Sequence, residues 1–544
     1  MDRTILEEIK NVVGGLATRP NVERLTPGQT KARAEKFCRQ TVFGNCNYVS
    51  SVKTLSTALT VYLGSERVEA GVYTQKKRDI KKSARQTIAS VHEYLKNAPI
   101  VQTCATMGSG SDFTPRCAFY VSKYRRESIR LAHMVTEGLF PAANDGQPDL
   151  TVVFIPEWQE KDRQVLVFPE IGVTYVLGTD YYGEAKNAFL RMAMWLAKER
   201  SMLGLHAGTK ILRARAEDGH IRKLGMMIFG IAATGKTTHS CHNHDLTAPG
   251  EGIEIVQDDV VFWKQDGSAL GSEKAFYIKT EGLSYETQPL LYNAAISENA
   301  ILENVMVDYH GNVYFDDRTL TANGHGLVQR DAISEYCSES INLPPVEELD
   351  GLIIAFMTRS YTVVPIASKL NCEQAAVAFM LSESIDASGS DQQGPAAPMR
   401  GISASPLVIG EASEDCNRFY QLLKSHGDRI QCYMLNTGGV GETVEHGLDG
   451  ARRVLKKVTR VQIPEMAAII RGIARGTIKW REDPNWMVET PEFVDGLDIA
   501  KFDLDRHYDQ NRIDASIAAI RLERMEYAKH LPGLDESIKP AAEF

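Results

Sequence analysis

The sequence predicts an α/β protein, because short apolar runs typical of strands alternate with segments of helical periodicity. A glycine-rich turn follows one of these apolar runs directly, at residues 230–237. The length of 544 residues is sufficient for two or more domain-sized units or one large bilobal body. Together these observations favour a large α/β enzyme over a small binding module.

The clearest strands are expected between residues 150 and 177. Three apolar runs there, 150–155, 164–168 and 173–177, are short and bounded by Pro, Gly or charged residues. Apolar residues at helical spacing then predict a helix over 185–200. Further strands are expected at 224–229 and 253–256, and the runs 304–307 and 312–315 predict a hairpin around the turn at 309–311.

The turn after the strand at 224–229 reads G-x-x-x-x-G-K-T, which is the P-loop pattern. A strand that turns through glycines into a helix directs successive backbone N–H groups at one point, where they bind phosphate oxygens. Lys236 would then reach the β- and γ-phosphates, and Thr237 would bind a metal ion. The predicted nucleotide-binding residues are Gly230, Ala232, Ala233, Thr234, Gly235, Lys236, Thr237 and Thr238.

An acidic pair supplies the second half of such a site. The run 253–256 ends at Gln257, Asp258 and Asp259, where a metal-binding carboxylate of the Walker-B type belongs. The alternative interpretation of both motifs is a glycine-rich turn and an exposed acidic pair without a ligand.

Composition narrows the function classes. A net charge of -9 argues against a general nucleic-acid binder, whose affinity comes from clustered Lys and Arg. No apolar run approaches the ~20 residues that span a bilayer, and the N-terminus has no leader pattern, so we expect no membrane partner. The nine scattered cysteines include no C-x-x-C pair, which favours a reducing compartment and a cytoplasmic location.

Several ordered motifs resemble those of ATP-dependent phosphoenolpyruvate carboxykinases, and the resemblance extends to about residue 505. Residues 178–187 read G-T-D-Y-Y-G-E-A-K-N, similar to the family's G-T-x-Y-x-G-E-M-K-K, and residues 230–238 read G-I-A-A-T-G-K-T-T, similar to G-L-S-G-T-G-K-T-T. Residues 205–209, L-H-A-G-T, resemble M-H-C-S-A. Further matches in family order are Y-I-K-T at 277–280, L-Y-N-A at 291–294, L-E-N-V at 302–305, F-D-D at 315–317 and Y-M-L-N-T-G at 433–438.

The resemblance implies a two-lobed carboxykinase-like fold with a P-loop nucleotide-binding lobe. It implies a substrate-side lobe at 1–203, a nucleotide- and metal-binding lobe at 204–544, and conversion of oxaloacetate and ATP to phosphoenolpyruvate, ADP and CO2. ATP, Mg2+ and Mn2+ are the implied cofactors, and a small acid is the implied substrate. The polar, Gly/Pro/Ser-rich stretch near 386–400 is expected to be a mobile loop, either a lid or a plain linker.

Carried over by motif, Lys236 and Thr237 serve the phosphates and magnesium. His206 and Asp259 would hold a second divalent ion, with Asn187 at the position of a further family ligand, a lysine. Tyr181 and Lys186 would face the substrate.

Three departures from the family motifs concern the metal site and acid recognition. Asn187 replaces the ligand lysine, and residues 321–325 read T-A-N-G-H where the family reads T-E-N-T-R, which puts His325 at a substrate arginine. The nearest counterpart of the N-terminal T-G-R-S motif is A-G-V-Y at 70–73, with Val72 at its arginine. Neither His nor Val forms the forked carboxylate contact of Arg. The arginines that could compensate are Arg116, Arg318, Arg330 and Arg359.

These departures leave three functions open from the residues alone. The first is a carboxykinase acting on oxaloacetate or a related β-keto acid; the second is a kinase of another small molecule or a protein hydroxyl without decarboxylation; the third is a non-catalytic nucleotide-binding protein. A cluster of His239, Cys241, His242 and His244 is either a zinc site or a polar helix surface and turn. The oligomeric state stays open, and a monomer is compatible with the sequence.

Overall fold

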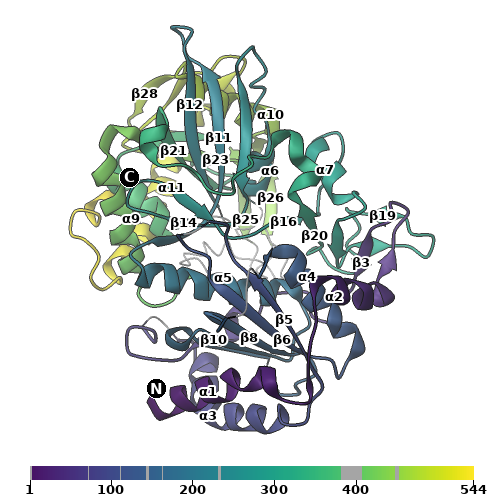
Figure 1. Ribbon diagram of the computed structural model, residues 1–544. Coiled ribbons are helices and arrows are strands. Elements are labelled where there is room, and N and C mark those ends of the chain that lie inside the picture. Colours follow the sequence, from purple (N-terminus) through teal and green to yellow (C-terminus); the bar gives the residue numbers. More distant parts are fainter. Residues whose placement is uncertain are drawn as a thin grey trace. The chain divides into compact units, whose positions relative to one another are not determined.

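The computed structural model describes residues 3–70, 73–110, 112–142, 146–161, 163–230, 234–381, 407–446 and 452–544 (Figure 1). The chain divides into two compact units. The first comprises Met1–Gly204, Leu270–Glu335 and Pro406–Glu411, and the second Leu205–Ala269, Tyr336–Ser405 and Ala412–Phe544. Mixed sheets covered by helices confirm the α/β class. The division at residue 203 and the two-lobed arrangement stay predictions, and the stretch near 386–400 lies outside the described residues.

The first unit is built on a mixed sheet with the order β1-β5-β6-β8-β10-β9-β4, in which β7 also pairs with β5. The three strands predicted between 150 and 177 are β8, β9 and β10, with the predicted bounds. Strand β8 runs parallel to both β6 and β10. The strands are β1 (Val22–Arg24), β4 (Thr60–Tyr62), β5 (Ile100–Thr106), β6 (Arg116–Ser122), β7 (Phe140–Pro141), β8 (Leu150–Ile155), β9 (Gln164–Phe168) and β10 (Val173–Leu177).

Helices cover both faces of this sheet, since alternate strand residues point to opposite sides. Residues of α1 and α3 pack with Tyr120, Val153 and Tyr175 in one core, and Figure 1 shows the two helices together on one side of the strands. The other face meets α5, where Phe189 lies 6.3 Å from Phe119 between ring centroids. The helices of this unit are α1 (Arg3–Gly14), α2 (Pro27–Ala34), α3 (Gln75–Tyr94), α4 (Ile129–Gly138), α5 (Tyr182–Glu199) and α7 (Pro289–Ala295).

A second, smaller sheet of the first unit has the order β16-β20-β17-β3-β2. It joins the N-terminal segment to residues beyond 270, because β17 pairs in parallel with β3. Cys46, the first residue of β3, forms a disulfide with Cys38, which the scattered cysteine pattern did not predict. The hairpin predicted around 309–311 is confirmed, with shorter strands. The strands are β2 (Arg39–Gln40), β3 (Cys46–Tyr48), β16 (Ala275–Lys279), β17 (Ile301–Glu303), β18 (Met306–Val307), β19 (Val313–Tyr314) and β20 (His325–Gln329).

The second unit is built on a sheet with the order β15-β14-β11-β12-β21-β23-β22-β29-β28, to which β13 is added beside β11. Its central strands β12, β21 and β23 are parallel, whereas β11 is antiparallel to β12. The predicted strands at 224–229 and 253–256 are parts of β12 and β13. The strands are β11 (Leu203–Arg215), β12 (Ile221–Phe229), β13 (Gly252–Gln257), β14 (Val260–Trp263), β15 (Ala269–Gly271), β21 (Gly351–Thr358), β22 (Ala367–Leu370), β23 (Ile430–Asn436), β28 (Lys479–Asp483) and β29 (Val488–Phe493). Two small hairpin-like pairs complete the unit, β24 (Gly439–Val440) with β27 (Thr459–Arg460) and β25 (Thr443–His446) with β26 (Arg452–Lys456).

Aromatic side chains form the core on one face of this sheet. Phe229 at the end of β12 lies 6.0 Å from both Phe379 of α8 and Phe419 of α9, whose rings stack at 4.4 Å. The short helix α6 contacts the opposite face, as described below. The helices of this unit are α6 (Lys236–Cys241), α8 (Cys372–Leu381), α9 (Ala412–His426), α10 (Ile463–Arg475) and α11 (Gln510–Lys529).

Candidate active site

The P-loop leaves the end of β12 at Gly230 and enters α6 at Lys236. A Cβ atom at Gly230 would lie 2.3 Å from the Thr234 hydroxyl, so a larger residue does not fit. Gly235 has a φ of +92°, which glycine adopts without strain. Ala232 and Ala233 lie outside the described residues, whereas Thr237 and Thr238 belong to α6. The described part of the loop therefore has the backbone that its glycines predict.

Asp259 connects three of the predicted residues. Its carboxylate lies 2.5 Å from the Lys236 ammonium and 2.8 Å from Nε2 of His206. All three side chains keep some contact with solvent, with exposed fractions of 10% for Lys236, 21% for Asp259 and 26% for His206. The cluster thus brings together the Lys236 ammonium from α6, the Asp259 carboxylate after β13 and the His206 imidazole from β11.

The donor atoms of this cluster suit a divalent ion. An imidazole nitrogen and a carboxylate oxygen are ligands for Mn2+, and carboxylate and hydroxyl oxygens suit Mg2+. Within the described ranges, no group of three or more His, Cys, Asp or Glu side chains is arranged around one metal position. This donor set fits an ion that takes its remaining ligands from nucleotide phosphates, as Mg2+ commonly does. Asn187, the other predicted ligand, belongs to α5 of the first unit.

The end of β23, two strands from β12 in the sheet, supports the P-loop. The Thr437 hydroxyl donates to the carbonyl of Thr234 at 2.7 Å, and the Thr437 amide donates to the carbonyl of Thr358 at 2.9 Å. The Asn436 side chain, which is fully buried, accepts from the amides of Ser360 and Gly438. These contacts lie at the carboxyl ends of the parallel strands β12, β21 and β23, where open α/β sheets bind ligands.

A second cluster, in the first unit, contains Tyr181 and His325. The His325 ring stacks on Tyr277 with centroids 4.4 Å apart and planes at 4°. Its Nδ1 lies 3.0 Å from the carbonyl of Asn323. Because a carbonyl only accepts, this bond requires the proton on Nδ1. The Tyr181 hydroxyl lies 3.4 Å from both His325 Nδ1 and the Tyr277 hydroxyl, so two of the predicted site residues, Tyr181 and His325, lie close together.

A buried carboxylate, Glu303, lies beneath these rings. It accepts from the Tyr277 hydroxyl at 2.8 Å, the Tyr182 amide at 3.0 Å and Arg130 at 3.1 Å. Burial raises the pKa of Glu303, and Arg130 opposes that rise. Burial also raises the pKa values of the Tyr181 and Tyr277 hydroxyls. Both phenols therefore stay protonated at neutral pH.

Lys186, expected to face the substrate, lies in a buried ion pair. Its ammonium is 2.8 Å from the Glu273 carboxylate, with exposed fractions of 4% and 3%. The predicted role of Lys186 stays a prediction.

Two cations that no motif indicated also belong to this region. Arg130 of α4 contacts Asp180 at 3.3 Å as well as Glu303, and Lys53 lies 3.3 Å from the side-chain oxygen of Asn304. Asn323 also donates to the carbonyl of Lys53 at 2.7 Å. Lys53 also donates to the carbonyl of Ser50, but the other partners named here lie at least 50 residues away in sequence, so no local pattern marks these contacts.

The candidate compensating arginines have other contacts. Arg318 pairs with Glu281 at 2.5 Å, and its side chain is 71% exposed. Arg330 lies over the Phe276 ring, and Arg359 of the second unit lies over Tyr361. Arg116 lies beside Gly146. Val72 lies outside the described residues.

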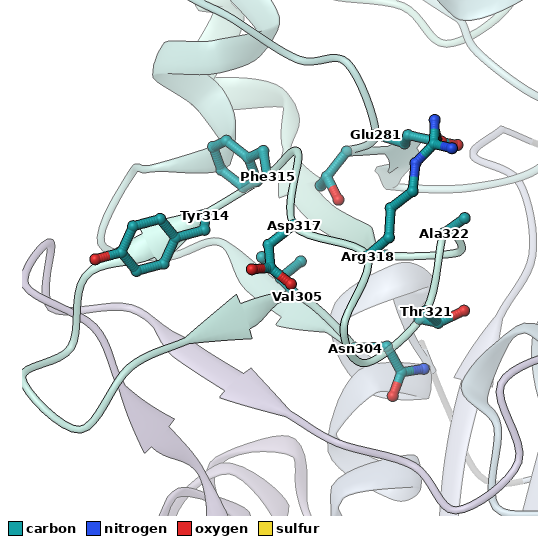
Figure 2. Close-up of a pocket in the computed structure, with 11 residues that line it drawn as sticks. Glu281, Asn304, Val305, Tyr314, Phe315, Asp317, Arg318, Thr321 and Ala322 are labelled. Carbon is teal, nitrogen blue, oxygen red and sulfur yellow. Dashed lines mark ion pairs between the residues drawn. The ribbon is translucent and has the colours of Figure 1, made fainter.

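A pocket with about 220 Å³ of empty space adjoins the cluster of Tyr181 and His325 in the first unit. Figure 2 shows Asn304, Thr321 and Ala322 around it, together with Asp317 and Arg318. Asn304 and Gly324 line the pocket, and Asn304 also contacts Lys53. The T-A-N-G-H segment thus separates this pocket from the rings of Tyr181 and Tyr277. Its lining is completed by Thr280, Glu281, Val305, Tyr314 and Phe315.

His239 and His244 are buried and His242 is half-buried, which corrects the expectation of a polar helix surface. His239 and His244 are 2% and 0% exposed. Their rings stack with centroids 5.9 Å apart, and His242 lies 5.3 Å from His244. A lysine ammonium, described below, lies among them.

Comparison with known proteins shows the family of this chain. The family model described as phosphoenolpyruvate carboxykinase matches residues 64–500. The chain is 28% identical over 449 residues to "Phosphoenolpyruvate carboxykinase (ATP)" of Aeropyrum pernix, covering 82% of this chain and 84% of that protein. It is 25% identical to the protein of the same name from Rhizobium rhizogenes, covering 78% and 75%. No helix in the described part of the chain is both long and apolar enough to cross a membrane. The chain belongs to the phosphoenolpyruvate carboxykinase (ATP) family.

Proposed function

We propose that the protein converts oxaloacetate and ATP to phosphoenolpyruvate, ADP and CO2. Family membership supports the reaction, and one observation supports it in this chain: Lys236 and His206 both contact Asp259 at the end of the P-loop. The relatives give no support to the kinase or the non-catalytic alternative. The partner is then a small acid.

In this proposal Lys236 binds the transferred phosphoryl group and offsets its developing negative charge. The Lys236 ammonium now contacts Asp259, so nucleotide binding exchanges a carboxylate partner for phosphate oxygens. Thr237, His206 and Asp259 hold divalent ions, with Asn187 as a further ligand through its amide oxygen. A bound Mg2+ or Mn2+ supplies charge stabilisation to phosphate and enolate oxygens.

We assign acid recognition to the first unit and nucleotide and metal binding to the second. Each lobe of the proposed two-lobed fold then has its own role in the reaction. The protonated hydroxyl of Tyr181 is a donor for a substrate oxygen, and His325 stands where the resemblance expects an arginine. A cytoplasmic location accords with this metabolic reaction and stays part of the proposal.

The reaction is tested by incubating the protein with ATP, Mn2+ and oxaloacetate and measuring phosphoenolpyruvate, ADP and CO2. Equal amounts of all three products are expected. ATP consumption that ignores oxaloacetate would support a kinase instead, and no nucleotide turnover would support a non-catalytic protein.

The metal assignment has its own test. Removing a ligand leaves an under-coordinated ion, so His206→Ala and Asp259→Ala are each expected to weaken Mn2+ binding by at least about 10-fold. Titration of free Mn2+ by electron paramagnetic resonance measures this without catalysis. Unchanged curves for both variants would remove these residues from the site.

A further inference from the structure

A buried lysine lies directly behind the P-loop helix. Lys210 of β11 has no exposed surface. Its ammonium lies 2.9, 3.3 and 2.7 Å from the carbonyl oxygens of His239, Ser240 and His242, and 2.8 Å from Nε2 of His244. These carbonyls belong to the last turn of α6 and the residue after it. A cation at the C-terminal end of a helix is favoured by the helix dipole and by such bonds.

Strand β11 contacts α6 at Gly208 and Lys210. Since alternate strand residues share a face, His206, Gly208 and Lys210 all point toward α6. A Cβ atom at Gly208 would lie 2.3 Å from the Ser240 hydroxyl, so the helix packs directly against the strand there. His206 and Asp259 lie at the end of α6 that begins with Lys236, and Lys210 lies at the other end. One strand face therefore holds both ends of the helix.

Helix α6 needs external support because it has only six residues. Helices this short are not stable alone. The following turn is unusual, since His244 and Asp245 have positive φ values of 56° and 54°. Arg471 contacts this turn from α10, at 3.0 Å from Asp245. Residues in sparsely populated conformations persist only where their surroundings enforce them.

The groups that face the Lys210 ammonium are neutral acceptors. Burial lowers the pKa values of His239, His242 and His244, and burial also lowers the pKa of Lys210 itself, to about 7. The carbonyl oxygens carry the partial negative charge of the helix end. Lys210 therefore interacts with dipoles and not with a carboxylate, and its removal would leave three carbonyl groups and an imidazole without their donor.

We propose that Lys210 is a positioning residue for phosphoryl transfer, which fixes α6 against β11 and so holds Lys236 and Thr237 at the phosphate groups of the nucleotide. This inference rests on the proposed function for its catalytic consequence. Nucleotide binding, measured directly, tests it independently of the acid substrate.

The decisive variant is Lys210→Met, which removes the ammonium and retains the length of the side chain. Misplaced catalytic groups lower kcat/KM steeply, so kcat/KM for ATP is expected to fall roughly 10- to 100-fold while KM for oxaloacetate stays unchanged. Arg524→Met is the matched control, because Arg524 is a buried cation of the same unit, 1% exposed, which bonds a carbonyl oxygen of Phe544. It is expected to lower thermal stability and leave KM for ATP unchanged.

Two further variants keep the proposal testable if Lys210→Met does not fold. Lys210→Arg retains donors for the carbonyl groups and is expected to keep much of the ATP affinity. His244→Leu removes one acceptor, whereas His244→Gln keeps an amide acceptor, so only the first is expected to weaken ATP binding in calorimetry. Equal ATP affinity in the Lys210, Arg524 and His244 variants would overturn the proposal. If the variants change ATP affinity as expected but the unmodified protein does not turn over oxaloacetate, only the proposed function would be overturned.

Discussion

The phosphate-binding region of the second unit and the acid-binding cluster of the first unit use their cations differently. Lys236 pairs with a carboxylate that is 21% exposed and that also contacts an imidazole. Arg130 and Lys186 pair with Glu303 and Glu273, and none of these four side chains is more than 4% exposed. Lys236 can therefore exchange its carboxylate partner for a ligand, whereas Arg130 and Lys186 are part of the core.

This difference separates cations that bind ligands from cations that stabilise the fold. Breaking a buried ion pair leaves an uncompensated charge, so Arg130 and Lys186 act mainly on their carboxylate partners. In the proposed function, acid recognition in the first unit therefore rests on hydroxyl groups, on His325 and on the half-buried Lys53. The following predictions test this division, from the largest expected effect to the smallest.

Lys236→Ala is expected to lower phosphoryl transfer by roughly 10²- to 10³-fold or more, because no neighbouring side chain replaces its charge. Product formation from ATP and oxaloacetate measures this loss, and the melting temperature is expected to change little. Lys223→Ala, at an exposed position of β12, is the control and keeps full activity. Activity of Lys236→Ala near the unmodified level would contradict its assignment to the phosphates.

Arg130→Met is expected to act on stability, since it leaves the Glu303 carboxylate buried and unpaired. The free energy of unfolding of the first unit should fall by about 3–5 kcal/mol, measured by urea unfolding. Arg33→Met is the matched control, because the Arg33–Glu23 pair is exposed, and its change should stay below about 1 kcal/mol. Equal effects of the two variants would show that burial does not separate these pairs. Addition of Glu303→Leu to Arg130→Met is expected to restore part of the stability.

His325→Arg is expected to improve use of oxaloacetate by up to about 10-fold in kcat/KM, because a permanently charged fork can bind a carboxylate or phosphate. Arginine also stacks on aromatic faces, so the contact with Tyr277 is retained. The effect is limited by Asn187 and Val72, which differ from the family as well. His310→Arg, in the exposed β18–β19 turn, controls for added charge. A lower kcat/KM for oxaloacetate would mean that His325 already serves this chain as its substrate contact.

The smallest expected effect is a dependence of the free energy of unfolding on pH. Burial lowers the pKa of Lys210 to about 7, from 10.5 in the unfolded chain. Between these pH values the unfolded chain binds the extra proton, so this residue makes the free energy of unfolding rise with pH. Lys210→Met should remove that contribution between pH 7 and 9, measured by urea unfolding, whereas Arg524→Met should keep it. The same slope in the unmodified protein and Lys210→Met would place the pKa outside this window.

Patterns over a few residues predicted the strands, helices and turns whose geometry is set by residues adjacent in the sequence. Strands β8, β9 and β10 have the predicted bounds because dense apolar runs end at Pro, Gly or charged residues. The prediction of α5 began three residues late, since Tyr182, Gly183 and Glu184 of its first turn show no helical apolar spacing. The backbone at Gly235 was predicted because its positive φ favours glycine, whereas nucleotide binding by the P-loop stays a prediction.

Long-range pairing escaped prediction for a physical reason. Arg130 and Glu303 are separated by 173 residues, and Lys210 lies about 30 residues before its acceptors. Nothing in the local sequence of either cation identifies its partner. The histidines after the P-loop were expected at a surface because α6 is too short for periodicity to reveal a buried face.

Residues 270–335 belong to the first unit although they follow a segment of the second unit in the sequence. This order has a consequence for how the chain folds. Strand β17 completes the small sheet by pairing with β3, more than 250 residues earlier in the chain. During synthesis, β3 and the Glu303 site around Arg130 must wait until the ribosome has released the first segment of the second unit, Leu205–Ala269. Contacts so distant in sequence form slowly and leave edges exposed meanwhile. A fragment ending at residue 204 would lack these partners, so expression of the first unit alone requires all three of its chain segments.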